Sequence, residues 1–195
     1  MKKTIILFVV ITMFSSAMSK TWEDKKNQLS IGISSFSVFS ALNEISWVGG
    51  NFENESETGV INLSYMHFFN KTFGFGGSLS YQEFNFKGFY NYEEDCIYDN
   101  YKASDKYITC MGVFQATWLH KKHASLYSKI GLGVICNTGN GPANSELFED
   151  YREFLAAYQL TPIGIDFGGR SLRGLVELGW GLESSLFRVG LRYAF

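Results

Sequence analysis

Apolar and polar residues alternate along the last ten residues of the chain, Leu186–Phe195. Two arginines and small residues occupy one face of this segment. The opposite face carries Phe187, Val189, Leu191, Tyr193 and Phe195. Such period-two alternation predicts a β-strand. A soluble sandwich would bury the apolar face, whereas a membrane β-barrel turns it outward to lipid and directs the polar face inward.

Seven segments upstream alternate in the same way, some of them less cleanly. They are Gln28–Val38, Gly59–Phe69, Phe73–Glu83, Lys106–Trp118, Ala124–Cys136, Phe154–Phe167 and Arg173–Leu182. In Phe154–Phe167 the alternation changes phase at Thr161-Pro162, where a bulge would shift the parity by one residue. In Arg173–Leu182 the pattern places Val176, Leu178, Trp180 and Leu182 on the outward face. The chain therefore predicts about eight strands, an even number.

The connectors between these segments alternate in length. Residues 70–72, 120–123 and 168–171 make short connectors. The last connector, residues 183–185, is also short and departs from this alternation. Long connectors rich in polar and aromatic residues span Ser40–Thr58, Asn85–Asp105 and Asn137–Glu153. Bacterial barrels have short periplasmic turns and longer external loops, so the long connectors are predicted to lie outside the cell. A soluble eight-stranded barrel such as a lipocalin is the alternative, but it would not require this alternation and its aromatic residues would point inward.

The N-terminus has the order of a secretory signal peptide. Lys2 and Lys3 precede an apolar run, Ile5–Phe14, which is followed by small residues. The run is too short to cross a hydrocarbon core of about 30 Å as a helix. Cleavage after Ser19 divides the chain into a signal peptide, residues 1–19, and one barrel domain, residues 20–195.

Composition and charge narrow the functions further. The chain holds 20 Gly, 18 Phe and 11 Tyr but two Pro, which suits strands with aromatic residues at membrane interfaces. A net charge of -2 offers no electrostatic case for binding nucleic acid. Export permits a disulfide, but the pairing among Cys96, Cys110 and Cys136 stays open. No cysteine or histidine spacing indicates a metal site, and no cofactor is expected.

Three segments carry a family resemblance: Leu186–Phe195, Gln159–Gly168 with its Pro-x-Gly, and Val176-Glu-Leu-Gly-Trp-Gly181. They resemble the small eight-stranded outer-membrane barrels of the OmpA/OmpX type, especially those of Bacteroidetes. The resemblance implies an all-β, up-and-down antiparallel transmembrane barrel in the outer membrane of a Gram-negative bacterium. It also implies that the last strand, with Tyr193 and Phe195, is the signal read by the barrel-assembly machinery. That machinery and outer-membrane lipids are the expected partners, and we expect a monomer.

Five charged residues point to the lumen by parity. They are Lys129, Asp166, Glu177, Arg188 and Arg192. Charges inside a narrow barrel are costly unless they are paired, so we expect salt bridges between neighbouring strands, such as Glu177 with Arg188 or Arg192. The cluster is either a gated ion path or a polar plug. The plug is favoured because eight strands leave an interior just filled by side chains.

Histidine is the next candidate for chemistry. His123-Ala124-Ser125 is similar to the His-x-Ser of barrels that deacylate lipid A. However, His67, His120 and His123 all map to the periplasmic end, away from the outer leaflet, and no histidine remains near the long loops to act as a general base. No catalytic residue is therefore assigned, and the chain is not expected to be an enzyme.

The long connectors hold most of the remaining polar and aromatic residues. Trp47 lies in the first, and the second interleaves aromatic residues with Glu93, Glu94, Asp95 and Asp99. These residues lack the regular spacing of a calcium-binding loop. The leading hypothesis is a structural or adhesin-like surface role with an unidentified ligand. A small-solute or ion channel and a lipid A-modifying enzyme remain the alternatives.

Overall fold

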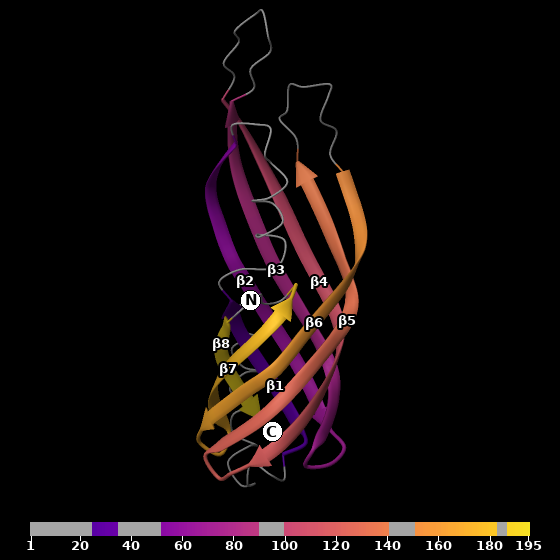
Figure 1. The fold of residues 1–195 in the computed structure, drawn as a ribbon, viewed down its shortest axis with the longest axis vertical. Coiled ribbons are helices and arrows are strands. Elements are labelled where there is room, and N and C mark those ends of the chain that lie inside the picture. Colours follow the sequence, from indigo (N-terminus) through magenta and orange to yellow (C-terminus); the bar gives the residue numbers. More distant parts are fainter. Residues whose placement is uncertain (1–24, 35–51, 90–99, 141–150, 183–186) are drawn as a thin grey trace, which may run out of the picture.

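The computed structural model describes residues 25–34, 52–89, 100–140, 151–182 and 187–195. In this part of the chain the strands are β1 (Asn27–Ser34), β2 (Phe52–Phe68), β3 (Phe73–Phe89), β4 (Asn100–His120), β5 (Ala124–Asn140), β6 (Tyr151–Gly168), β7 (Leu172–Gly181) and β8 (Phe187–Ala194). Consecutive strands pair antiparallel, and β1 also pairs with β8 (Figure 1). The predicted fold class, a closed up-and-down barrel of eight strands, is confirmed. The described residues contain no helix that could span a membrane.

The alternating parity places apolar side chains outside and polar side chains inside. Leu132 on β5 is 66% exposed and Trp180 on β7 is 65% exposed, whereas Asn62 on β2 and Thr161 on β6 are fully buried. Buried polar and charged residues outnumber buried apolar ones in the described part of the chain. A soluble barrel would bury its large apolar side chains. The lipocalin-like alternative is therefore wrong.

The predicted change of phase in β6 is a bulge at Pro162. Tyr127 pairs with Gly164 and Lys129 with Thr161, so two residues of β6 lie opposite one of β5. Pro162 and the following residue are both exposed, and outward parity then resumes. Because proline has no N–H to donate, the bulge lets it sit in the sheet without breaking a ladder hydrogen bond.

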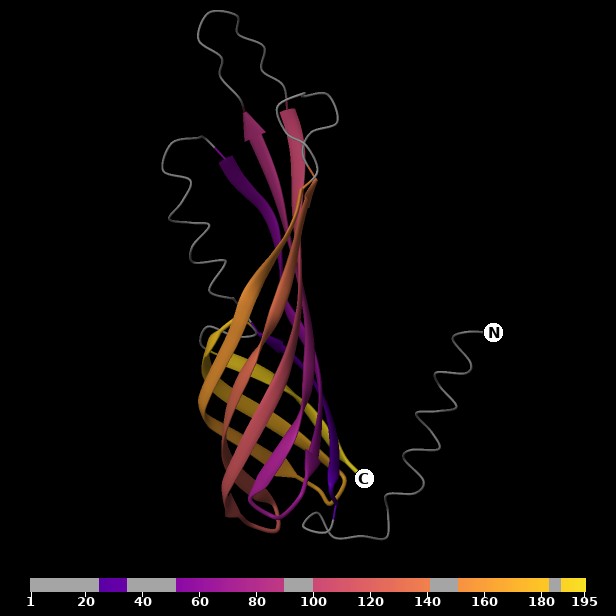
Figure 2. The same ribbon diagram turned by 90° about the vertical axis from the view of Figure 1, so that its right-hand side faces the viewer.

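The strands differ greatly in length, and this produces a wall on one side of the barrel. β2 to β6 each span 17 to 21 residues, whereas β1, β7 and β8 span eight to ten. The five long strands rise well beyond the three short ones (Figures 1 and 2). We call the parts of β2–β6 above the closed barrel the extension: residues 52–58, 85–89, 100–105, 139–140 and 151–153.

The extension corrects the predicted boundaries of the long connectors. Residues 52–58, 85–89, 100–105, 137–140 and 151–153 were assigned to loops and instead belong to strands. Backbone pairing runs to Phe89↔Asn100 between β3 and β4. Residues 53–58 are all polar, so this part of β2 lacks the apolar face that makes a strand recognisable. Its backbone pairing with β3 nevertheless continues, with register shifts between Asn54 and Ser56 and between Thr58 and Ile61. Residues 35–51, with Trp47, and the acidic residues 93–99 lie outside the described residues.

One residue assigned to the outward face lies in the interior. Leu182 is only 6% exposed and belongs to an apolar cluster with Phe84, Tyr107 and Ile135. The strand ends at Gly181, whose φ of 150° is not accessible to other residues without strain. The backbone turns there, so the parity that held along β7 no longer applies to Leu182.

Two glycines of β5 face the interior in different surroundings. A Cβ added to Gly133 would overlap the backbone carbonyl of Cys110 on β4. A Cβ added to Gly131 would lie 3.5 Å from the Met111 sulfur and 3.6 Å from the nearest side-chain carbons, which is ordinary contact. At this height the close approach of β4 and β5 therefore requires glycine at position 133 but not at position 131.

Gly133→Ala is expected to lower the free energy of unfolding by about 1–3 kcal/mol, the usual cost of overpacking. Gly131→Ala on the same strand is the matched control and should change it by less than about 0.5 kcal/mol. Urea unfolding of protein refolded in lipid vesicles, followed by tryptophan fluorescence, measures both. Equal losses in the two variants would contradict the proposed close approach.

Candidate functional site

The interior charges lie on β5, β6, β7 and β8, which form one side of the lumen. Glu177 on β7 is at the centre of the upper half of this cluster. Lys129 Nζ donates to its Oε2 at 2.8 Å, and Arg188 Nη1 donates to the same oxygen at 3.1 Å. Arg192 Nη2 lies 3.6 Å from Oε1. All four side chains are at most 4% exposed.

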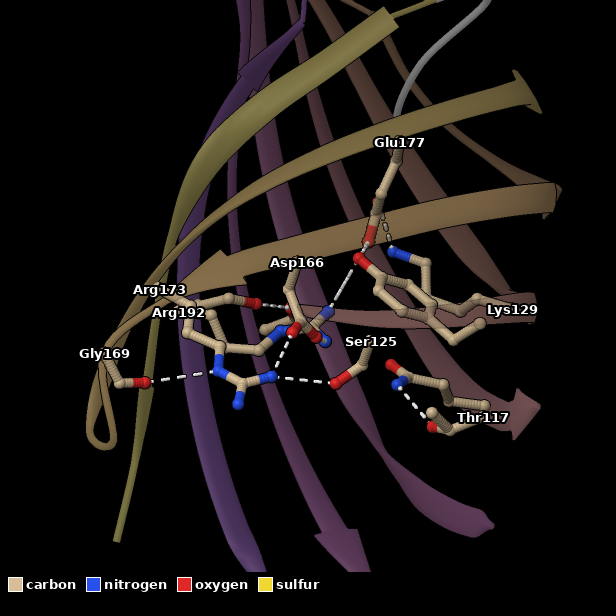
Figure 3. Close-up of polar contacts among 12 residues, drawn as sticks. Thr117, Ser125, Lys129, Asp166, Gly169, Arg173, Glu177 and Arg192 are labelled. Atoms are coloured by element: carbon tan, nitrogen blue, oxygen red, sulfur yellow. Dashed lines mark hydrogen bonds and ion pairs between the residues drawn. The ribbon is translucent and has the colours of Figure 1, made fainter. Parts of the chain in front are cut away.

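Asp166 on β6 is at the centre of the lower half. Arg173 Nη1 donates to its Oδ1 at 2.7 Å, and Arg192 Nη1 donates to Oδ2 at 3.0 Å. Arg173 also donates to Ser125 Oγ at 2.8 Å and to the carbonyl oxygen of Gly169 (Figure 3). A further bond runs from Arg173 Nη2 to the carbonyl oxygen of Lys122. These bonds tie the lower lumen to the β4–β5 and β6–β7 turns.

Tyr127 and Arg192 join the two halves. The Tyr127 hydroxyl donates to Glu177 Oε1 at 2.7 Å and accepts a bond from Arg192 Nη2 at 2.9 Å. The Arg192 guanidinium also lies over the Tyr127 ring, 4.5 Å from its centroid, in cation–π geometry. Arg192 therefore contacts both carboxylates, and the whole cluster is one connected network.

All five predicted lumen charges point inward, and the expected bridges from Glu177 to Arg188 and Arg192 are both present. Three members of the network were not included in the predicted cluster: Arg173, Tyr127 and Ser125. Parity places Arg173 and Tyr127 on the inward faces of their strands. The alternation of apolar and polar residues therefore also identifies these two, provided that neutral residues and residues at strand ends are included in the lumen cluster. Ser125 carries no sequence signal beyond its parity.

Four cations surround the two carboxylates of this network. Removing charges from water costs several kcal/mol per ion, and this cost is offset only by close and numerous partners. Here each carboxylate has at least two charged donors in hydrogen-bonding or ion-pair range. The arrangement can cross-link four strands and fill the lumen between them. It offers no nucleophile next to a base.

A small cavity opens below the network, at the end of the barrel with the short turns. It has a volume of about 30 Å³, and Lys25, Gln28, Gln115, Thr117 and Asp166 contribute to its lining. Buried amide oxygens of Gln28 and Gln115 accept no hydrogen bond from the described residues. Burial lowers the pKa of Lys25, whose ammonium donates to Ser171 Oγ at 2.6 Å. The cavity has room for about one or two water molecules.

The histidines lie where the sequence places them, at the end with the short turns. His67 Nδ1 is 2.8 Å from Asn27 Oδ1, and His123 Nδ1 is 3.3 Å from the Gly168 carbonyl oxygen. Ser125, the second residue of the His-x-Ser segment, is buried and bonded to Arg173. Among the described residues, no group of three metal-ligating side chains could hold a metal ion.

Two of the three cysteines are described. Cys110 and Cys136 lie on the outward face and are not bonded to each other. Cys110 on β4 pairs with Val134, and Cys136 on β5 pairs with Ile108, so they are diagonal neighbours. Cys136 Sγ accepts a hydrogen bond from Arg152 Nε at 3.3 Å. Cys96 lies outside the described residues, and a disulfide that includes it stays a prediction.

The C-terminal segment is partly as expected. Phe187, Val189 and Leu191 are about half exposed on the outward face. Tyr193 shares their parity but is only 9% exposed, and its ring stacks on Phe195 at 5.9 Å between centroids. The role of Tyr193 and Phe195 in assembly stays a prediction.

Glu177→Gln is expected to lower the free energy of unfolding by about 3–5 kcal/mol, because it leaves buried cations without the charge that compensates them. The substitution keeps the size of the side chain, so packing is not the variable. Glu153→Gln, at an exposed position of β6, is the control and should have little effect. Urea unfolding in lipid vesicles measures both, and equal stability of the two variants would show that the network contributes nothing.

No known family matches the sequence, and no curated protein matches it. Several solved structures share the arrangement of strands. The attachment invasion locus protein Ail of Yersinia pestis, in complex with the heparin analogue sucrose octasulfate, is 16% identical with a TM-score of 0.47, covering 88% of this chain and 99% of that chain. The N-terminal β-barrel domain of Pseudomonas aeruginosa OprF is 13% identical with a TM-score of 0.45, covering 88% and 100%.

Proposed function

We propose that the chain is an integral outer-membrane barrel with a structural or adhesin-like surface role and no catalytic activity. The observation that carries the membrane assignment is the inverted parity of the closed barrel. Its exterior exposes large apolar side chains on every strand, and its interior holds the buried ionic network. Only a solvent as apolar as lipid makes this arrangement favourable.

Both edges of the apolar exterior support this assignment. Aromatic side chains mark the edge near the short turns, with Phe73 and Trp118 exposed. At the other edge a single row of paired outward residues is polar: Thr58, Glu83, Lys106, Thr138 and Arg152. On β3 ten residues separate the two edges. At about 3.3 Å per residue and a tilt of about 40°, this gives a band about 25 Å tall, as in outer-membrane barrels.

The surface role is supported by the extension of β2–β6. Strand pairing continues above the polar row, to Phe52↔Gly88 between β2 and β3 and Gly139↔Tyr151 between β5 and β6. Because β1 pairs no further than Val60 and β7 no further than Gln159, the extension has two free strand edges among the described residues. A rigid sheet standing above the membrane suits contact with other surfaces better than transport.

The channel alternative is motivated by the charged lumen. Against it, Tyr127, Glu177 and Arg188 are each at most 1% exposed, so side chains fill the barrel at this height. The cavity below them has room for water alone. A plug that stabilises the barrel therefore accounts better for the network than an ion path does.

The lipid A-modifying alternative is motivated by His123-Ala124-Ser125. Ser125 is engaged with Arg173, and the segment lies at the end with the short turns. Mass spectra of lipid A from cells with and without the gene would test it. A change in acylation that depends on Ser125 would contradict the non-catalytic proposal.

Shortening the β3–β4 hairpin tests the surface role. Phe86 pairs with Ala103, so deleting residues 87–102 and inserting Asn-Gly keeps the register with a two-residue turn. The shortened protein is expected to fold, which heat-modifiable migration on a gel reports. Binding of cells to host surfaces should fall toward that of cells lacking the protein. Unchanged binding together with unchanged detergent sensitivity of the envelope would contradict the proposal.

Planar-bilayer recording distinguishes a lumen that is plugged by the ionic network from a lumen that conducts ions. The purified wild-type protein is expected to give no discrete conductance steps, because the network closes the lumen. Glu177→Gln, compared with Glu153→Gln, tests whether weakening the network opens a path. Regular steps in the wild-type protein would favour the channel.

A further inference from the structure

The β2–β3, β4–β5 and β6–β7 turns lie at one end of the barrel, and each of them exposes at least one cation. Lys71 lies in the β2–β3 turn, Lys121 and Lys122 in the β4–β5 turn, and Arg170 in the β6–β7 turn. Lys26, just before β1, is exposed at the same end. No exposed Asp or Glu accompanies them among the described residues of this end. We call these five residues the basic turn end.

The opposite edge of the apolar band is different in charge. There Lys106 Nζ is 3.9 Å from Glu83 Oε1, and Arg152 is followed by the exposed Glu153. Cations and carboxylates are mixed at that edge, whereas the turns present cations only. The difference gives the two ends of the barrel different preferences for anionic surfaces.

Each turn also carries an exposed aromatic side chain close to its cation. Phe69, beside Lys71, is 58% exposed, Trp118 near Lys121 is 57% exposed, and Phe167 near Arg170 is 52% exposed. The cation is two or three residues away in each case, within about 10 Å along the chain. The cations therefore lie at the depth where lipid headgroups meet the apolar band.

Hydrogen bonds fix the turns that carry these cations. Asn70 Oδ1 accepts from the backbone N–H groups of Thr72 and Phe73 at 2.8 and 2.7 Å. Lys121 N–H donates to the Ala124 carbonyl at 2.8 Å, and Gly169 N–H donates to the Leu172 carbonyl at 2.9 Å. The backbone is ordered before any ligand binds, so less conformational entropy is lost on binding.

We propose that the basic turn end binds the phosphate groups of anionic phospholipids in the leaflet around the turns. The cations complement the phosphates in charge, and their surface continues directly into the apolar band that contacts the acyl chains. The inference rests on the membrane insertion proposed above. Peptidoglycan also carries negative charge, but a polymer beyond the membrane does not explain why each of the three turns carries an exposed aromatic ring near its cation.

Lipid selectivity of the full chain in vesicles tests the proposal. The probes are spin-labelled phosphatidylglycerol and spin-labelled phosphatidylcholine in phosphatidylcholine vesicles. At low salt the wild-type protein is expected to hold phosphatidylglycerol about fivefold more strongly, the factor that one cation near an anionic surface contributes. The ratio of phosphatidylglycerol to phosphatidylcholine association should approach one in about 1 M salt, where the screening length is about 3 Å.

The double variant Lys121→Gln/Arg170→Gln is expected to lower this preference, because it removes two of the five cations of the basic turn end. Lys106→Gln/Arg152→Gln is the matched control, because it also removes one lysine and one arginine but at the other edge, and it should keep the preference. Equal loss in both variants, or no preference in the inserted wild-type protein, would overturn the inference. So would binding to isolated peptidoglycan that depends on Lys121 and Arg170 without any lipid preference.

Heat-modifiable migration and protease protection report insertion separately. A wild-type chain that does not insert contradicts the proposed function and the inference together. A chain that inserts without lipid selectivity contradicts the inference alone. The two failures are therefore distinguishable in one set of samples.

Discussion

Pairing of β1 with β8 is the constraint on which the rest of the barrel depends. The seam runs through seven residue pairs, from Gln28↔Ala194 to Ser34↔Arg188. Lipid offers no partner for a backbone N–H or C=O, so a sheet in the apolar band must leave no open edge. Closure with eight strands in turn makes the lumen narrow. Inward positions must then be small, as at Gly133, or must satisfy one another.

The ionic network is the second way in which side chains fit into the narrow lumen, because its charged groups satisfy one another. Apolar residues such as Met111 and Ile135 fill the interior along β2–β6 together with uncharged polar residues such as Gln115, while charged residues fill it along β5–β8. Each carboxylate is shared by cations from different strands, so the network resists changes of register that would separate them. A network of this kind specifies one arrangement of strands at the cost of dehydrating its charges.

Outside the apolar band the constraint is relaxed. Water satisfies free backbone groups there, so strand lengths need not match and β2–β6 continue as an open sheet (Figure 2). At the other end the strands stop within a few residues of the band, and short hydrogen-bonded turns hold cations against it. The same barrel thus presents two chemically different surfaces, a tall sheet at one end and a compact basic rim at the other.

How far each feature follows from sequence depends on what its residues contact. Alternation within the apolar band predicts strand identity, parity, the bulge at Pro162 and the inward charges, because lipid and lumen impose opposite chemistry on successive residues. Above the band lipid no longer imposes this alternation, so residues 85–89 and 100–105 are not recognised as strands from the pattern alone. Leu182 was misassigned because Gly181 turns the backbone and ends the parity. Partner choice, such as Asp166 with Arg173 and Arg192, depends on the stagger of four strands, which only the closed barrel decides.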